Sequence, residues 1–177
     1  MEIQGTISFN VMKIIITDTN VFFDVISIKA LPEFFALDYE ICTTDFVVNE
    51  ILQSDQKELI NSFIRSRKLS ILQLSEEDIE EIKAFKTVRF FKGITDKTVL
   101  WKAIKLKCTL LTGDKKLKKE AEDHKIEVHG SIWVINQLIE VKIITKVEGI
   151  KLLEMLMDIN GSLPHDEIEK FMKFYKL

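Results

Sequence analysis

Short apolar strands alternate with amphipathic helical segments along this chain, and that alternation restricts the possible folds more than any single motif does. The strand-like runs are residues 13–17, 39–44, 69–74, 108–112 and 126–128. Helical spacing of apolar residues follows each of these runs. Parallel strands need such crossover helices, and helices on both faces bury the strands. The sequence therefore predicts a three-layer α/β/α sandwich around a central, mainly parallel sheet.

Ser75, with Asp78 three residues on, predicts a capped helix to roughly Val88. Thr145 and Glu148 predict another capping box, which opens a helix with the apolar stripe Val147, Ile150, Leu153 and Leu156 or Met157.

Length and composition fit one domain. The chain has 177 residues, of which 46% are hydrophobic and 30% charged, which is enough for one sizeable core. We predict a single domain over residues 12–177, with a core at about 13–140 and a C-terminal helical extension at about 145–177. Residues 1–11 precede Met12 and are either an N-terminal extension or part of the fold.

Charge and cysteine content restrict partners and location. The formal net charge of -3 argues against a chain coated in basic residues, so any contact with nucleic acid must be local. Cys42 and Cys108 lie in apolar, strand-like surroundings, as expected for reduced cysteines in a core. No apolar run is long enough for a membrane helix, and the N-terminus does not resemble a signal peptide. A cytoplasmic protein without membrane contact is expected.

Four acidic residues are predicted to gather at one edge of the sheet. Asp18 follows the first strand, and Asp114 follows the strand at 108–112. Asp96 opens the helix of about 95–107 on its buried stripe, and Glu50 borders the apolar face of the helix after the second strand. Each acid alone has an ordinary explanation, as a helix-terminal, turn or solvated charge. Together they would converge, because ligands collect outside the carboxyl ends of parallel strands.

Convergent carboxylates need neutralisation. Two carboxylates roughly 4 Å apart repel by about 4 kcal/mol at an effective dielectric constant near 20, so protons or a bound cation must balance them. An all-oxygen site favours Mg²⁺ or Mn²⁺ over zinc. Such ions most often act on phosphates, which makes phosphodiester hydrolysis the expected reaction. A small phosphorylated substrate fits less well, because the sequence lacks a phosphate-cradling glycine loop.

Four short motifs resemble those of PIN domain nucleases, which include the toxin ribonucleases of type II toxin–antitoxin pairs. The matching stretches, in the family's order, are DTN (18–20), TTDFVVNEIL (43–52), ITDKTVLWKAI (94–104) and TGDKKLKKEA (112–121). The resemblance covers roughly residues 13–133. The helices at 145–177 resemble the tail of a related branch of predicted nucleic-acid-binding PIN-like proteins.

The resemblance assigns roles to particular residues. It implies that four acids form the catalytic, metal-binding pocket, supported by two polar residues. The acids are Asp18, Glu50, Asp96 and Asp114, and the supports are Asn20 and Thr112. It also implies an RNA substrate, a small antitoxin partner and a homodimer. The leading hypothesis is thus a Mg²⁺- or Mn²⁺-dependent endoribonuclease of the toxin type, and the alternative is a PIN-like module that binds nucleic acid or protein without cutting.

Other polar residues near the motifs carry weaker expectations. Lys115, Lys116 and Lys119 follow Asp114 and are either RNA contacts or a solvated helix face. No series of aromatic residues for base stacking stands out in the sequence. Asp24 is expected to be exposed or at the pocket rim, outside the chemistry.

Two further residues have ordinary explanations. Asp45 is expected to cap a helix beside Thr44. Lys97, where the PIN domain family more often carries a small residue, is expected to point outward.

Overall fold

A five-stranded parallel sheet forms the centre of the protein. The computed structural model describes residues 13–91 and 93–175, so the expected extension at 1–11 lies outside the described residues. The strands are β1 (Lys13–Thr17), β2 (Tyr39–Thr44), β3 (Ser70–Leu72), β4 (Thr109–Leu111) and β5 (Val128–His129). They lie in the order β3-β2-β1-β4-β5, and every neighbouring pair is parallel. The central strands are apolar and covered on both faces, which fixes their register through burial.

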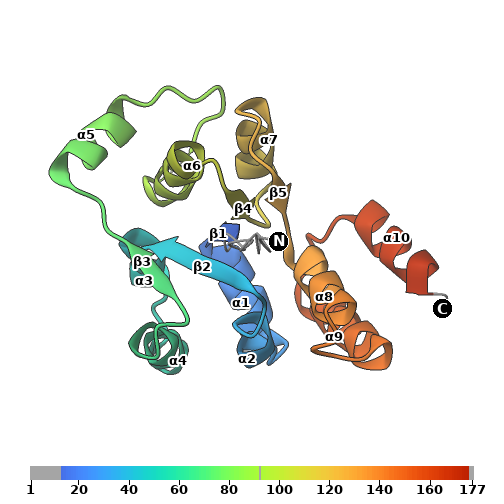
Figure 1. The fold of residues 1–177 in the computed structure, drawn as a ribbon. Helices are drawn as coiled ribbons and strands as arrows, with labels where there is room; N and C mark the ends of the chain where they lie inside the picture. Colours follow the sequence, from blue (N-terminus) through green and yellow to red (C-terminus); the bar gives the residue numbers. More distant parts are fainter. Residues whose placement is uncertain (1–12, 92, 176–177) are drawn as a thin grey trace, which may run out of the picture.

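Helices cover both faces of the sheet, which confirms the predicted α/β/α sandwich (Figure 1). They are α1 (Thr19–Ser27), α2 (Leu31–Phe34), α3 (Asp45–Glu50), α4 (Ser54–Arg65), α5 (Glu76–Ala84), α6 (Thr95–Leu106), α7 (Lys115–Asp123), α8 (Ser131–Glu140), α9 (Lys146–Ile159) and α10 (His165–Tyr175). In Figure 1, α6 and α7 lie above the sheet, and α1, α2, α4, α8 and α9 lie below it. Among the described residues, no helix is long and apolar enough to cross a membrane.

The predicted capping boxes are present, whereas several predicted boundaries are wrong. Ser75 and Thr145 each accept a hydrogen bond from the backbone N–H three residues later, and an acid there bonds back to the cap, as expected at a helix start. Helix α5 ends at Ala84, although we predicted about Val88. The described residues that follow, 85–91 and 93–94, lie outside regular secondary structure. The last strand begins at Val128, two residues later than predicted.

The C-terminal helices pack against α8 along a face that differs in part from the predicted stripe. Leu153 and Leu156 are buried as expected, but Val147 is 62% exposed. Gly149, rather than Val147, lies against α8, and a Cβ at this position would be 2.3 Å from Cδ1 of Ile139. The absence of a side chain thus lets α9 approach α8 closely.

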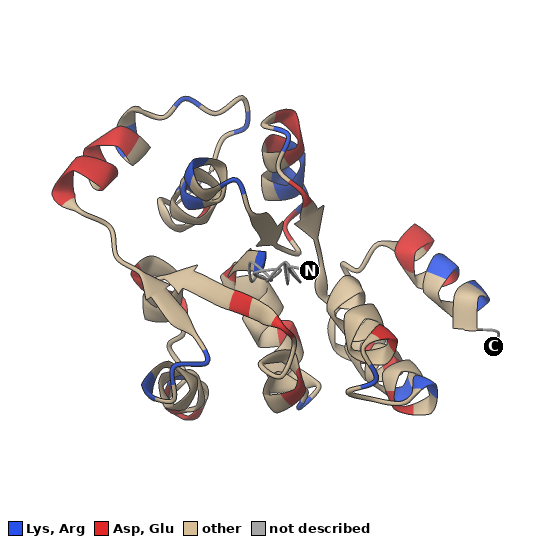
Figure 2. Ribbon diagram, in the orientation of Figure 1, with Lys and Arg blue, Asp and Glu red and all other residues tan. Residues whose placement is uncertain are grey.

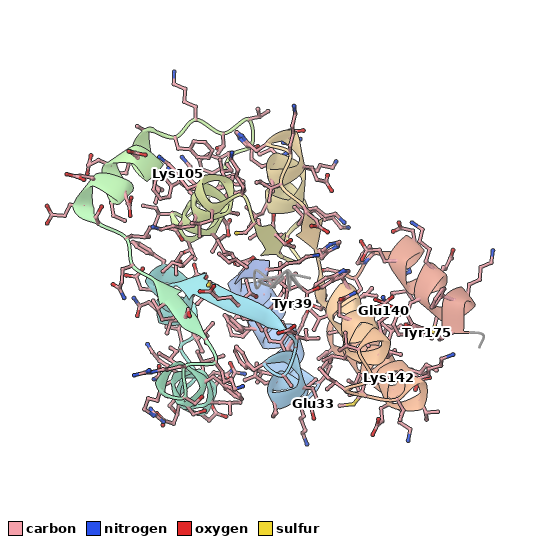
Figure 3. All side chains as sticks on the ribbon, in the orientation of Figure 1. Glu33, Tyr39, Lys105, Glu140, Lys142 and Tyr175 are labelled. Carbon is pink, nitrogen blue, oxygen red and sulfur yellow. The ribbon has the colours of Figure 1, made fainter. Side chains whose placement is uncertain are left out.

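Helix α10 also rests on α8. Phe171 is buried, and the Tyr175 hydroxyl donates a hydrogen bond to Asn136 of α8 at 2.6 Å. Figure 3 labels Tyr175 and Glu140, which lies on α8. Burial raises the pKa of Tyr175, and the negative charge of Glu140 also raises it. Two free cysteines, Cys42 and Cys108, lie on or beside the central strands, and burial raises the pKa of both thiols.

Candidate active site

The strand order changes direction at β1, and that point organises the site. The chain goes from β1 outward to β2 and β3, then returns to place β4 and β5 on the other side of β1. A crevice opens at the carboxyl ends of β1 and β4, where open parallel sheets bind their ligands. Asp18 follows β1 there, and its backbone N–H donates to the Leu111 carbonyl of β4 at 2.9 Å. Asp18 is therefore fixed at the switch point.

Three donors hold the Asp18 carboxylate, which is almost fully buried. Its Oδ1 accepts the backbone N–H of Thr19 at 2.7 Å, which makes Asp18 the N-cap of α1. Its Oδ2 accepts from the Thr112 hydroxyl at 2.9 Å and from the Asn20 amide at 3.2 Å. The two residues predicted as polar supports thus both contact Asp18.

Glu50 and Asp114 lie beside Asp18, each with one oxygen already engaged. Glu50 ends α3 and is exposed, and its Oε2 accepts the Thr19 hydroxyl at 2.7 Å. Asp114 is the N-cap of α7, and its Oδ1 accepts the backbone N–H groups of Lys116 and Leu117, both at 2.8 Å. The second oxygen of each carboxylate remains available as an acceptor.

Asp96 approaches the same edge from the first turn of α6. A hydrogen bond of 2.9 Å between the hydroxyls of Thr44 and Thr98 holds that turn against the end of β2. Asp96 is half-buried, and no described residue donates a hydrogen bond to its carboxylate. Val99 and Leu100, which we used to predict its orientation, are fully buried. Asp96 therefore faces the site without a partner of its own.

Burial and mutual repulsion hinder ionisation of two of the acids. Burial, together with the negative charges of Asp18, Asp114 and Glu50, raises the pKa of Asp96 to about 7. Burial likewise raises the pKa of Asp18 to about 6, against the lowering effect of its hydrogen bonds from Thr112 and Thr19. The four predicted acids thus form one electrostatic group, as their positions in the sequence suggested.

The carboxylate oxygens suit a hard cation as ligands, although the four side chains are not arranged around a common metal position. Among the described residues, no group of three or more His, Cys, Asp or Glu side chains is arranged to hold a metal ion. Glu50 and Asp114 are turned toward Thr19 and the α7 backbone, respectively. The acids nevertheless offer only oxygen ligands, and burial and the neighbouring acids raise the pKa values of Asp18 and Asp96, which a bound cation would counteract. These residues fit Mg²⁺ or Mn²⁺ better than zinc.

The lysines after Asp114 form an exposed basic surface at the start of α7. Lys115, Lys116 and Lys119 are exposed, and none forms an ion pair with another described residue. Figure 2 shows this basic part of α7 next to α6. By contrast, Lys102 and Lys105 of α6 pair with Asp78 and Glu81 of α5, at 3.2 and 2.9 Å, respectively. The α7 lysines are therefore the ones with charge available for phosphates.

Asp24 was expected to be exposed or at the pocket rim; it is buried rather than exposed, and it lines the hollow that contains Asn20 and Asp114. Asp24 accepts the Ser131 hydroxyl at 2.5 Å and the Asn160 amide at 3.0 Å, so it joins α1 to the start of α8 and the end of α9. Its burial was not expected, because these donors come from residues far along the chain. Although Asp24 borders the hollow, its own bonds hold the C-terminal helices.

The expectations for Lys97 and Asp45 are wrong. Lys97 does not point outward, since its ammonium donates to the Phe85 carbonyl at 3.2 Å. Asp45 is the first residue of α3, and its side chain makes no capping hydrogen bond, while Thr44 occupies the N-cap.

Sequence reasoning also missed Glu120, which is fully buried on α7. Its carboxylate accepts the backbone N–H groups of Val88 and Arg89, at 2.8 and 3.0 Å, and the Arg89 guanidinium at 3.1 Å. The available signal was its place beside Ala121 and three residues after Leu117, on the apolar face of α7.

Comparison with known proteins identifies the family of the chain. A family model described as a PIN domain (DUF3368) matches residues 14–176. Among solved structures, the chain is similar to a PilT N-terminus domain protein of the hyperthermophilic archaeon Sulfolobus solfataricus P2. The identity is 12%, the TM-score is 0.48, and the match covers 72% of this chain and 94% of the other. A search of curated proteins gave no significant match. Because the family model spans nearly the whole chain, the protein belongs to the PIN domain family, whose members are usually nucleases that use divalent metal ions.

Proposed function

We propose that the protein is a metal-dependent endoribonuclease that hydrolyses phosphodiester bonds of RNA. One observation carries the proposal: at the carboxyl edge of the sheet, Asp96 receives no hydrogen bond from the described residues, and burial and three nearby acids raise its pKa to about 7. A carboxylate in that state destabilises a fold unless a cation or a proton neutralises it. Such placement is typical of functional sites.

In the proposed mechanism, the carboxylates of Asp18, Glu50, Asp96 and Asp114 would hold Mg²⁺ or Mn²⁺. When bound, the ion supplies an activated water and stabilises charge on the leaving oxygen. Thr112 and Asn20 keep Asp18 in one orientation by donating to the same oxygen. Thr19 orients Glu50.

The lysines of α7 complete the proposed site. Lys115 and Lys116 line a hollow together with Asn20 and Asp114, where they can hold the phosphates on either side of the bond that is cut.

Cleavage by matched variants tests this proposal. We expect wild type to cut unstructured RNA internally in Mg²⁺ or Mn²⁺ and not in EDTA. Asp96→Asn should lose at least 100-fold of the rate, on the order of the electrostatic effects of single active-site groups. The control is Asp55→Asn, an exposed acid on α4, which should cut like wild type. Equal cleavage by wild type and Asp96→Asn would refute the proposed site.

Calorimetry separates the nuclease from a non-catalytic PIN-like module. A working site binds Mg²⁺, and that binding should disappear in Asp18→Asn. RNA binding without Mg²⁺ binding or cleavage would instead support the module.

We further propose that the nuclease is the toxin of a type II pair with a small antitoxin and acts as a homodimer. The similarity of its four motifs to toxin ribonucleases supports this role. Expression of wild type in a bacterium should arrest growth, and Asp96→Asn should not. Light scattering should give twice the mass of one chain, and a neighbouring short reading frame should encode a protein that restores growth. Growth unaffected by the active enzyme would contradict the toxin role.

A further inference from the structure

Residues 87–89, in the loop that follows α5, are held against α7 by several hydrogen bonds. The buried carboxylate of Glu120 accepts the backbone N–H groups of Val88 and Arg89. The Arg89 side chain also pairs with Asp123 at 2.5 Å, and the Thr87 hydroxyl donates to the Arg89 carbonyl at 2.8 Å. These bonds come from both the backbone and the side chains of the loop. The loop therefore has a defined conformation on α7.

That conformation turns one phenylalanine outward and the next one into the core. Phe91 is 8% exposed, whereas Phe90 is 78% exposed. Burying a phenylalanine side chain contributes about 1.5 to 3 kcal/mol, and Phe90 forgoes most of that contribution. An exposed aromatic ring on a firmly held loop is thus not explained by folding. It is a surface available to a ligand.

The ring borders a basic hollow, which we call the Phe90 groove. It has a volume of about 480 Å³ and is lined by Phe90, Arg89, Glu122 and the lysines Lys115, Lys116 and Lys119. The three lysines are exposed and form no ion pair with other described residues. Lys118, which also borders the groove, is paired with Glu167. On a chain of net charge -3, this is a local concentration of available positive charge.

The Phe90 groove continues toward the acids. Lys115 and Lys116 line both this groove and the hollow that contains Asn20 and Asp114. A chain bound along these two lysines would therefore pass from the acidic edge to the Phe90 ring.

We propose that the Phe90 groove binds a single-stranded stretch of RNA next to the bond that is cut, with phosphates on the lysines and one base stacked on Phe90. The inference rests on the proposed function for the identity of the substrate. Lysines alone would hold duplex and single strand alike, but only an unpaired base exposes its face to an aromatic ring. The groove therefore selects single strands. The isolated ring reads no sequence, since every base has a stacking face.

Binding measured in EDTA tests the groove without any need for cleavage. Fluorescence anisotropy of a labelled oligouridine gives the Kd of each variant. Phe90→Ala should weaken binding by about 5- to 150-fold, the range of one lost base–aromatic stack. Phe90→Trp should bind like wild type, whereas Phe90→Leu should be as weak as Phe90→Ala. The ring is exposed, so these variants should keep the circular dichroism of wild type.

Two matched controls separate stacking from general surface effects. Val88→Ala removes an apolar side chain that is 85% exposed in the same loop, and Phe174→Ala removes a phenylalanine that is 70% exposed on α10. Both should bind oligouridine like wild type. Lys116→Ala and Lys119→Ala should each reduce the slope of log Kd against log salt by about 0.7, because each removes one phosphate contact.

Several outcomes would overturn the groove. They are equal binding by Phe90→Ala and wild type, full binding by Phe90→Leu, equal affinity of wild type for duplex RNA, and no binding of oligouridine by wild type. If Phe90→Ala binds and cuts like wild type, only the groove is wrong, and a protein partner becomes the better occupant. If binding depends on Phe90 but no RNA is cut, the nuclease proposal fails and the groove stands.

Discussion

Two regions of the molecule bury carboxylates in opposite ways. At the junction of α7 with the α5–α6 loop, Glu120 accepts two backbone N–H groups and the Arg89 guanidinium. At the acidic edge of the sheet, Asp96 accepts no hydrogen bond from the described residues and faces three other acids. The first arrangement satisfies a buried charge and stabilises the fold. The second leaves a charge for something outside the chain to neutralise, which distinguishes a candidate site from a structural contact.

Asp18 lies between these extremes. It has three hydrogen-bond donors, but all are neutral, and burial still raises its pKa to about 6. Donors therefore orient this carboxylate without neutralising it. That combination suits a residue whose position must be fixed while its charge stays available.

The largest expected effect concerns the satisfied carboxylate. Glu120→Ala leaves two backbone N–H groups and Arg89 without their acceptor, so the free energy of unfolding should fall by about 3 kcal/mol. Urea denaturation measures this change. Glu122→Ala, an exposed neighbour on the same helix, should change stability by less than about 0.5 kcal/mol. A small loss in Glu120→Ala would mean that its bonds contribute little, and the contrast between the two regions would disappear.

Asp96→Asn should instead raise the free energy of unfolding, and only at neutral or higher pH. The pKa of Asp96 rises from 3.8 to about 7 on folding, so the folded state binds the proton more tightly than the unfolded state does. The wild-type protein therefore loses stability as the pH increases from about 4 to about 7. In EDTA at pH 8, Asp96→Asn should be more stable than wild type by about 1 to 2 kcal/mol, since water screens the partly exposed carboxylate.

Thermal unfolding at two pH values checks that prediction. At pH 4, where Asp96 is protonated, the two proteins should unfold at similar temperatures. A variant that is destabilised equally at pH 4 and pH 8 would show that Asp96 has a structural role, like Glu120. Adding Mg²⁺ at pH 8 should raise the unfolding temperature of wild type and not of Asp96→Asn.

The fold and the acids of the site could be predicted because their signals are local. The apolar run before Asp18 reads as a buried strand, and parallel strands bring their ends to one edge whatever the strand order. The helix start at Ser75 was equally predictable, because a capping box lies within four residues. In each case the signal lies within a few neighbouring residues.

The unpredicted features all depend on contacts between distant residues. Asp24 meets Ser131 and Asn160 across more than a hundred positions, so no local pattern indicated its burial. The residues after α5 appeared to continue that helix, because the Glu120 carboxylate that holds Val88 and Arg89 comes from α7, about thirty positions away. The role of Gly149 was also not predicted, because it depends on a close approach to Ile139 of α8. Tertiary contact decides these positions, and it also formed the Phe90 groove.

The smallest expected effect concerns Thr112, whose hydroxyl donates to Asp18 and accepts the Asp114 backbone N–H at 3.1 Å. That bond favours the ionised form of Asp18, so Thr112→Val should raise the pKa of Asp18 above its value of about 6, whereas Thr112→Ser should leave it near that value. Carbon-13 NMR titration of the Asp18 carboxyl without metal measures the change. If the pKa were unchanged in Thr112→Val, Asp18 would be governed by burial alone, as a core group is. A rise would place Asp18 with Asp96, as a charge that the chain orients but does not neutralise.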